Sequence, residues 1–363
     1  MSGHFWDHAV NFFTEPILAS HDHQRFEVLC YSNQAKEDET TRRLQTYADH
    51  WRRIDTLEDD AVTELVRNDQ IDILVDLAGH IAGNRLLVFA RKPAPIQVTY
   101  IGYQNTTGMT AMDYRLTDDW ADPPGTTDAF YTEKLVRLPR CFFCYQPSCD
   151  APPVNCLPAI EKGVVTFGSF NNFAKVTPQV LSAWAAILNA VPGSRLVVLA
   201  NAARSLGEYL TRTFEGHGIS GDRVTLADRR PRGAYLELIR QVDIALDPFP
   251  FNGHTTTCDA LWQGVPVVTL AGRMYAARFG SSGHVNLGLR ELIASTSDEY
   301  VEIAARLAGD VERLKELRAG LRDRMIASPL LDFVGFTRNL EAAYRRMWVD
   351  GCAAERTTSG ANS

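Results

Sequence analysis

A polar run, HTTT at positions 254–257, stands between two apolar stretches of the chain. It follows the strand-like VDIALDP and leads into a helix-like segment. Backbone N–H groups in the first turn of a helix have no partner within the helix and lie at the positive end of its dipole. With Gly253 for close approach, the hydroxyls of Thr255 and Thr256 therefore indicate a phosphate site. The alternative is a capping pair between Thr256 and Asp259.

A second loop carries polar residues at an equivalent point. In FGSFNNFAKVTP, Asn171, Asn172 and Lys175 lie between an apolar strand and a helix that opens at Thr177. The carboxyl ends of parallel strands share one edge of a sheet, so this loop should emerge beside the polar run. The ammonium group of Lys175 could then reach the same anion. The alternative is an ordinary exposed loop lysine.

These loops need alternating strands and helices to position them. From about Gly163, apolar runs alternate with amphipathic stretches, which predicts a parallel sheet covered by helices on both faces. Thr177-Pro178 predicts a helix start, while Gly218 and Gly264 fall where helices should end. The first half shows the same rhythm in FEVLCYS, IDILVDLAG and IQVTYIGY. The predicted class is α/β, with two doubly wound, Rossmann-like domains facing a cleft.

The domain boundary is expected in a segment rich in proline and cysteine that ends near Pro158. We predict an N-terminal domain over residues 1–157 and a second domain over residues 158–328. A closing amphipathic helix is expected over residues 329–350, followed by a disordered tail over residues 351–363.

Composition excludes several classes of protein. The net charge is −7 and the basic residues are scattered, which argues against nucleic-acid binding. No run approaches the roughly 20 apolar residues that span a bilayer, and the first residues show no export signal, so a cytoplasmic protein is expected. The seven cysteines suit reduced thiols, and Cys141 and Cys144 offer only a weak alternative as zinc ligands. Neither a dinucleotide fingerprint nor a P-loop occurs.

Three long segments resemble the catalytic region of the O-GlcNAc transferase and SPINDLY family, glycosyltransferase family 41. They are FNGHTTTCDALWQGVPVVTL, FGSFNNFAKVTPQVLSAWAAILNAVP and ARKPAPIQVTYIGYQNTTGMTAMDY, and the similarity extends from about Ser2 to Trp348. The resemblance implies a GT-B fold and inverting transfer of N-acetylglucosamine from UDP-GlcNAc to Ser/Thr hydroxyls of proteins, without a metal or other cofactor. Alternatives are O-fucosyl transfer from GDP-fucose, N-glucosyl transfer from UDP-glucose, and a catalytically inactive protein that binds a nucleotide sugar.

The resemblance also assigns roles to residues of the second half. His254, Thr255 and Thr256 would hold the diphosphate, and Asp259 would bind the ribose hydroxyls. Lys175 would neutralise the departing phosphate, which gains charge as the bond to the sugar breaks.

Five further residues would contact the donor. Asn172 would bind it through its amide, Tyr235 would stack on uracil, and Arg232 would lie near the base or ribose. In the first half, Ile101 and Gly102 belong to a loop that approaches the sugar, where glycine permits close contact.

The N-terminal motif HFWDHAV resembles the family's segment that carries a histidine near the acceptor hydroxyl, which implies that role for His8. An unperturbed histidine pKa of about 6.5 suits a general base, and an oxygen of the donor's own phosphate is the alternative. His4 stands where several relatives carry aspartate, so no carboxylate base is assigned there. The resemblance further implies a chain truncated at its N-terminus, without the family's first strand and without tetratricopeptide repeats.

Overall fold

The computed structural model describes residues 1–200 and 204–360, and the chain divides into two compact units. Unit 1 comprises residues 1–146 and 329–363, and unit 2 comprises residues 147–328. Both units consist of parallel strands and helices, so the predicted α/β class is confirmed.

The two units separate between Gln146 and Pro147, so the boundary predicted near Pro158 lies too far along the chain. Arginines of helix α12 (Val311–Ile326) explain the difference. Arg318 donates to the Asn155 carbonyl oxygen at 3.2 Å, and Arg322 donates to the Pro152 carbonyl oxygen at 2.8 Å. These bonds attach the expected linker to unit 2.

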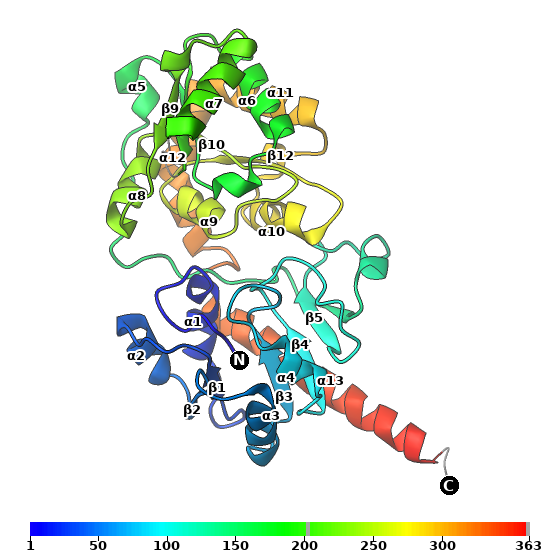
Figure 1. The fold of residues 1–363 in the computed structure, drawn as a ribbon. Coiled ribbons are helices and arrows are strands. Elements are labelled where there is room, and N and C mark those ends of the chain that lie inside the picture. The colour runs from blue at the N-terminus through cyan, green and yellow to red at the C-terminus, as the bar shows by residue number, and fades with distance from the viewer. Residues whose placement is uncertain (201–203, 361–363) are drawn as a thin grey trace. The chain divides into compact units, whose positions relative to one another are not determined.

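Unit 2 is built on a six-stranded parallel sheet in the order β12-β11-β10-β7-β8-β9 (Figure 1). Its strands are β7 (Thr166–Ser169), β8 (Arg195–Leu199), β9 (Val224–Ala227), β10 (Ile244–Leu246), β11 (Val267–Leu270) and β12 (Ile293–Ala294). Its helices are α5 (Pro158–Lys162), α6 (Pro178–Ala190), α7 (Arg204–Gly216), α8 (Arg232–Arg240), α9 (Thr255–Trp262), α10 (Phe279–Asn286), α11 (Ser297–Gly309) and α12, with short 3₁₀ turns η2 (Phe173–Lys175), η3 (Gly221–Arg223), η4 (Tyr275–Ala277) and η5 (Arg290–Leu292).

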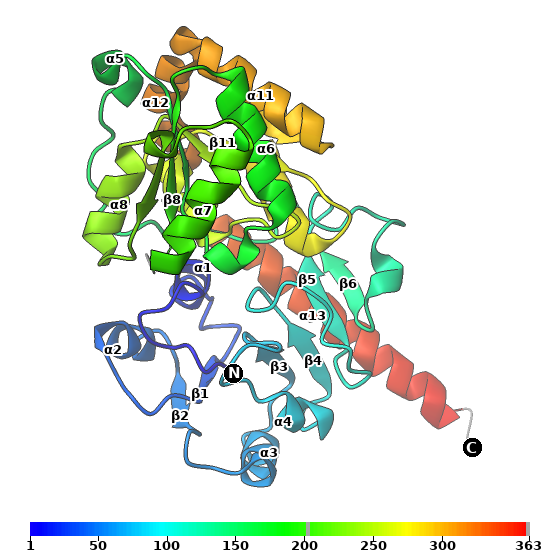
Figure 2. The same cartoon turned by 45° about the horizontal axis from the view of Figure 1, so that its top comes forward.

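The helices cover both faces of this sheet (Figure 2). Helix α6 packs against α11, while α9 packs against α8 and α12. Strands β7 and β10 are buried at every position, as expected for parallel strands between two helical layers. The predicted punctuation is confirmed: Thr177 caps α6 by accepting a bond from the Val180 N–H, and Gly218 and Gly264 take the left-handed conformation beyond α7 and α9.

Unit 1 contains two separate parallel sheets, one of two strands in the order β1-β2 and one of four strands in the order β3-β4-β5-β6. The strands are β1 (Leu29–Ser32), β2 (His50–Arg53), β3 (Ile73–Asp76), β4 (Ile96–Thr99), β5 (Tyr114–Thr117) and β6 (Lys134–Arg137). The helices are α1 (Asn11–Leu18), α2 (Glu39–Gln45), α3 (Asp59–Asn68), α4 (Leu86–Ala90) and α13 (Phe333–Gly360), with the 3₁₀ turn η1 (Asp128–Phe130). Helices α3 and α4 pack together over a core that includes Leu74, while α13 packs against α1 and β4.

Helix α13 is longer than predicted. It runs from Phe333 to Gly360, so the prediction of a disordered tail is wrong for residues 351–360, and residues 361–363 lie outside the described part. The segment CAAER after Gly351 contains good helix formers and no proline, which explains why the helix continues.

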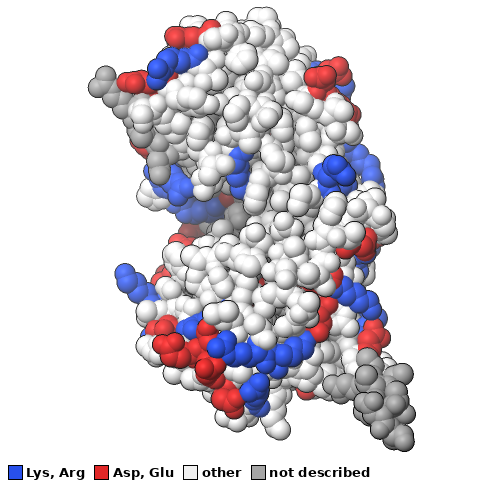
Figure 3. Space-filling model, turned by 45° about the vertical axis from the view of Figure 1, so that its right-hand side comes forward, with Lys and Arg blue, Asp and Glu red and all other residues white. Residues whose placement is uncertain are grey.

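The surface shows no dominant charge on the face drawn in Figure 3, where basic and acidic side chains lie in small mixed groups. None of the helices within residues 1–200 and 204–360 is both long and apolar enough to cross a bilayer.

Candidate active site

The carboxyl ends of the unit 2 strands lead into the predicted loops, and several predicted residues meet there. A pocket of about 490 Å³ lies at this edge of the sheet. Asn172, Tyr235 and Thr256 line it, together with Phe170, Asn171, Phe173, Leu199, Ala200, Leu206, Arg229 and Arg230. Four of the lining residues, Asn171, Asn172, Tyr235 and Thr256, were therefore predicted from the sequence, and they come from three different loops or helices.

Helix α9 begins at Thr255, as predicted, and His254 precedes it without capping it through its side chain. The Thr256 hydroxyl donates to the Asn171 side-chain oxygen at 3.0 Å. Thr256 therefore joins two strand-end loops, whereas the carboxylate of Asp259 pairs with Arg232. In the first turn of α9 the Thr257 N–H donates to the His254 carbonyl oxygen at 3.1 Å, while the N–H groups of Thr255 and Thr256 lie at the helix start, where they suit an anion.

Gly253 lies where no larger residue fits. A Cβ atom at this position would lie 2.5 Å from the Thr256 hydroxyl oxygen, 2.6 Å from that of Thr257 and 2.9 Å from the Asn171 side-chain oxygen. Neighbouring side chains therefore lie so close to the Gly253 backbone that a side chain at this position would collide with them. The buried Thr257 hydroxyl has no hydrogen-bond partner among the described residues, which leaves a polar atom beside the candidate anion site.

The side chain of Lys175 contacts the same loop. Its ammonium group donates to the Asn252 carbonyl oxygen at 2.7 Å and lies 4.1 Å from the centre of the Phe251 ring. Burial lowers the pKa of Lys175 to about 8, while the negative charge of Asp247 acts to raise it. The alternative of an ordinary exposed lysine is therefore wrong, because a largely buried ammonium group is available to an anion.

Asp247 contacts the same loop, and the sequence did not single it out. Its carboxylate accepts bonds from the Gly253 N–H at 2.6 Å and from the Thr269 hydroxyl at 3.0 Å, and its side chain is almost fully buried. The Tyr300 hydroxyl also donates to its carbonyl oxygen at 3.0 Å. Burial raises the pKa of Asp247 to about 7, whereas the Gly253 bond and the charge of Lys175 act to lower it. Asp247 thus holds the anion loop to the end of β10.

Arg232 and Asp259 form an ion pair between α8 and α9. The guanidinium group donates through two nitrogens to the buried carboxylate, with one N···O distance of 2.6 Å. The guanidinium carbon lies 5.5 Å from the centre of the Tyr235 ring. Burial and then the charge of Asp259 raise the pKa of Tyr235 well above its usual value, so its phenol stays neutral. All three residues therefore form one cluster beside the pocket.

Two predicted donor-binding residues have other contacts. His254 stacks on Phe279 with ring centres 4.0 Å apart and an interplanar angle of 18°. Asn172 accepts a bond from the Ala174 N–H at 3.2 Å and caps η2. Both side chains remain partly or fully exposed to solvent.

His8 lies in unit 1, next to His4, with ring centres 4.3 Å apart. Burial and then the neighbouring His4 lower the pKa of His8 to about 4, so the ring is neutral at neutral pH. The Val10 N–H donates to Nδ1 at 3.2 Å, which places the proton of the neutral ring on Nε2. In this conformation His8 presents a donor to an incoming group.

Ile101 and Gly102 form a tight turn after β4. Ile101 has a φ of 54°, and the Gly102 N–H donates to the Tyr100 carbonyl oxygen at 2.7 Å. A Cβ atom on Gly102 would overlap the Leu77 carbonyl oxygen. Position 102 therefore requires glycine because its backbone lies close to the Leu77 backbone within unit 1.

Possible metal ligands do not gather in the part of the chain that the structure describes: no three His, Cys, Asp or Glu side chains lie close enough together to hold an ion. The CxxC thiols of Cys141 and Cys144 are both buried. The predicted absence of a metal requirement stays a prediction.

Comparison with known proteins identifies the family. The family model described as glycosyl transferase family 41 matches residues 1–147 and 157–340. A Hordeum vulgare protein named as probable UDP-N-acetylglucosamine--peptide N-acetylglucosaminyltransferase SPINDLY is 46% identical over 359 residues, which cover 97% of this chain and 38% of that protein. The Arabidopsis thaliana protein with the corresponding name SEC is 32% identical over 98% of this chain and 37% of its own length.

Solved structures agree with this result. A structure of a Thermobaculum terrenum O-GlcNAc transferase mutant superposes with a TM-score of 0.92 at 43% identity, covering 98% of this chain and 68% of that one. Anabaena HepE in complex with UDP and glucose is 12% identical, covers 95% of this chain and 98% of its own, and superposes with a TM-score of 0.56, which shows a shared fold. The chain thus has a GT-B glycosyltransferase fold and belongs to glycosyltransferase family 41.

Proposed function

We propose that this chain is the catalytic region of a protein O-GlcNAc transferase, which moves N-acetylglucosamine from UDP-GlcNAc to Ser or Thr hydroxyls of proteins with inversion at the sugar carbon. The chain spans 38% of the length of the barley relative, so whole-protein activity and partners are part of this proposal. The names of the curated relatives and the anion site of unit 2 support it.

The first turn of α9 carries most of this argument. The N–H groups of Thr255 and Thr256 at this helix start and the closely packed backbone of Gly253 suit the diphosphate of a nucleotide sugar, and the Thr256 hydroxyl would turn away from Asn171 to donate to it. Tyr235 and the nearby arginines at the 490 Å³ pocket provide a flat ring and positive charge for the nucleoside. Asp259 is occupied by Arg232, so its proposed contact with ribose requires the two to share the carboxylate.

The leaving group determines what the protein must supply. As the acceptor oxygen bonds to the sugar carbon, the bond from that carbon to the β-phosphate oxygen breaks, and the electron pair leaves with UDP. The ammonium group of Lys175 and the dipole of α9 can balance this growing negative charge. We therefore propose that the reaction needs no metal ion.

The proton of the acceptor hydroxyl needs a base. Nδ1 of His8 already accepts the Val10 N–H, and Nε2 carries a proton. We therefore assign the base role to a phosphate oxygen of the donor and give His8 a donor's role at the acceptor hydroxyl.

Calorimetry with UDP and GDP, combined with a transfer assay on Ser/Thr peptides, tests this proposal. We expect binding of UDP in preference to GDP, and transfer from UDP-GlcNAc that persists in EDTA. If the protein instead transfers sugar from GDP-fucose or UDP-glucose, N-acetylglucosamine is the wrong donor sugar in this proposal. UDP binding with no transfer from any donor would indicate the inactive alternative.

A further inference from the structure

The loop between β10 and α9 carries an aromatic ring to which the chemistry described above gives no role. Phe251 is only half-buried, whereas Phe249, two residues earlier, is almost fully buried and packs on Tyr300 with ring centres 5.4 Å apart. The backbone after Phe251 is fixed, because the Asn252 N–H donates to the Ala276 carbonyl oxygen at 2.8 Å. Packing of the core therefore explains the ring of Phe249 but not that of Phe251.

The ring of Phe251 instead lies beside two residues of the candidate site. The Lys175 ammonium group is 4.1 Å from the centre of this ring. His254 stacks on the same ring, with centres 6.2 Å apart and an interplanar angle of 29°, and Phe279 of α10 stacks on His254 in turn. Phe251 therefore lies next to both basic side chains that the family resemblance assigns to the phosphates of the donor.

The ammonium group of Lys175 has partners of two kinds, polar and aromatic. It donates to the Asn252 carbonyl oxygen at 2.7 Å. Asp247 acts on it through charge, while the carboxylate oxygens of Asp247 accept from the Gly253 N–H and the Thr269 hydroxyl. The aromatic ring adds an attraction for the cation and carries no net charge, so it does not repel a phosphate as a closely paired carboxylate would.

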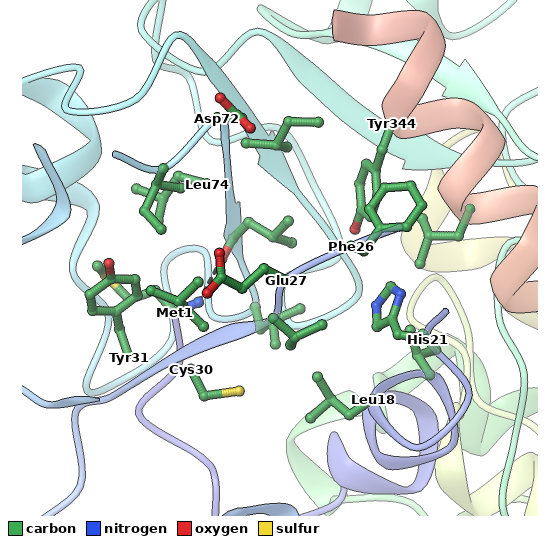
Figure 4. Close-up of a pocket in the computed structure, with 18 of the residues that line it drawn as sticks. Met1, Leu18, His21, Phe26, Glu27, Cys30, Tyr31, Asp72, Leu74 and Tyr344 are labelled. Atoms are coloured by element: carbon green, nitrogen blue, oxygen red, sulfur yellow. Dashed lines mark hydrogen bonds between the residues drawn. The ribbon is translucent and has the colours of Figure 1, made fainter. Parts of the chain in front are cut away.

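A contact of the same type in unit 1 shows what is special about this one. There the guanidinium carbon of Arg345 lies 4.9 Å from the centre of the Phe26 ring. Phe26 and Tyr344 line a pocket of about 430 Å³ (Figure 4), and Arg345 is exposed, so water hydrates its charge. Lys175 is largely buried instead, and contacts between cations and aromatic rings are stronger where water is excluded. The charge of Lys175 therefore depends on the partners that the protein supplies.

We propose that Phe251 is a positioning residue for Lys175: its ring holds the ammonium group at the Asn252 carbonyl oxygen and favours the charged form of the lysine. This role rests on the proposed function of Lys175 at the departing phosphate. Because the ring adds no charge of its own, the positive charge remains available to the phosphate as the bond to the sugar breaks. Leucine at position 251 would remove the attraction for the cation, whereas tyrosine would keep the aromatic face.

The first measurement uses the protein without nucleotide, so it does not depend on the proposed function. NMR of lysine labelled with ¹³C at Cε follows protonation, and the signal of Lys175 is the one that is missing from Lys175→Ala. Burial already lowers the pKa of Lys175 to about 8, and the titration midpoint in Phe251→Leu should fall by about half a pH unit to one pH unit more. Phe251→Tyr should keep the midpoint of the parent protein.

The second measurement connects the ring to nucleotide binding. Calorimetry should show that Phe251→Leu binds UDP about as tightly as the parent protein near pH 6.5 and about threefold more weakly near pH 8, where more of Lys175 has lost its proton. If the Lys175 midpoint falls while UDP affinity is unchanged at both pH values, the positioning role is supported and the proposed role of Lys175 at the phosphate is wrong. The two proposals can therefore fail separately.

Phe249→Leu is the matched control, because it removes a ring from the same loop and leaves the contact between Phe251 and Lys175. An unchanged Lys175 midpoint in Phe251→Leu would overturn the proposal, and so would an equal fall in Phe249→Leu. If Phe251→Leu does not fold, a difluorinated phenylalanine is incorporated at position 251, since fluorine weakens the attraction of a ring for a cation with little change in shape. A lower Lys175 midpoint then supports the proposal, and an unchanged midpoint contradicts it.

Discussion

The two units place their candidate functional residues in different ways. In unit 2 the site lies at the edge of a continuous six-stranded sheet, and its loops are bonded to one another through Asn171, Asp247 and Thr256. In unit 1 the sheet is interrupted, and the candidate residues His8 and Ile101 belong to irregular backbone. The candidate phosphate site is therefore built from bonds within unit 2 alone, whereas the positions of His8 and Ile101 depend on how loops of unit 1 pack.

The largest expected effect follows from removing the buried cation of unit 2. Lys175→Ala should lower kcat for transfer by about 10²- to 10³-fold and weaken UDP binding, because no other ammonium group in this loop can balance the leaving phosphate. Lys162→Ala is the matched control, since Lys162 also donates to a backbone carbonyl of unit 2, at 2.9 Å, but is exposed. Steady-state kinetics and calorimetry measure both. Equal behaviour of the two variants would remove Lys175 from the mechanism.

The next effect should appear in turnover without a change in nucleotide binding. His8→Ala should reduce kcat by about twofold to tenfold, the range for losing a hydrogen bond between neutral groups, while the Kd for UDP stays unchanged. The same assays measure it, with His23→Ala as a control on an exposed histidine of unit 1. A changed Kd for UDP in His8→Ala would contradict the prediction that unit 2 binds the nucleotide without help from His8.

A pair of glycine substitutions should separate nucleotide binding from stability. Gly253→Ala should weaken UDP binding by about tenfold, because its Cβ would press on Thr256 and Asn171. Gly102→Ala should instead lower the free energy of unfolding by about 1–3 kcal/mol, because its Cβ would overlap the rigid Leu77 carbonyl. Calorimetry with UDP and thermal unfolding distinguish them. A stable Gly102→Ala protein with weakened UDP binding would reverse this assignment.

The fold was predictable wherever strands are continuous apolar runs. The runs that became β3, β4, β7, β10 and β11 were identified as apolar runs, and β4, β7 and β10 are buried at every position. The strand β5 was not identified because it carries Arg115, which is almost fully buried. Its guanidinium group donates to the Tyr103 and Asn105 carbonyls at 2.9 and 2.7 Å. No local pattern reveals such long-range bonds in advance.

The candidate site was predictable where its residues form a run or share a loop. Two features predicted an anion site from residue type and position. One is the polar run at the start of α9, and the other is Lys175. Asp247 was missed because a single carboxylate after a strand has many ordinary roles, and only folding brings it to the Gly253 N–H. The pairing of Arg232 with Asp259 was missed for the same reason, although each residue was named separately.

The smallest expected effect concerns how Asp247 controls the charge of Lys175. Because the pKa of Lys175 is about 8, UDP affinity should fall severalfold as the pH rises through 8 and the ammonium group loses its proton. Asp247 has a pKa of about 7, so above neutral pH its carboxylate helps Lys175 to keep that proton. Asp247→Asn should therefore shift the loss of affinity to lower pH, with the largest difference from the parent protein between about pH 7 and 8.

The control for this shift lies at the other end of the same strand. Asp243 is also a buried carboxylate, and it accepts from the Ala159 and Thr166 N–H groups at 2.8 Å, away from the anion loop. Asp243→Asn should destabilise unit 2 and leave the pH midpoint of UDP binding unchanged. Calorimetric titrations from pH 6 to 9 measure both variants. If Asp247→Asn kept the parent's midpoint, Asp247 would only hold the loop in place and would not set the charge of Lys175.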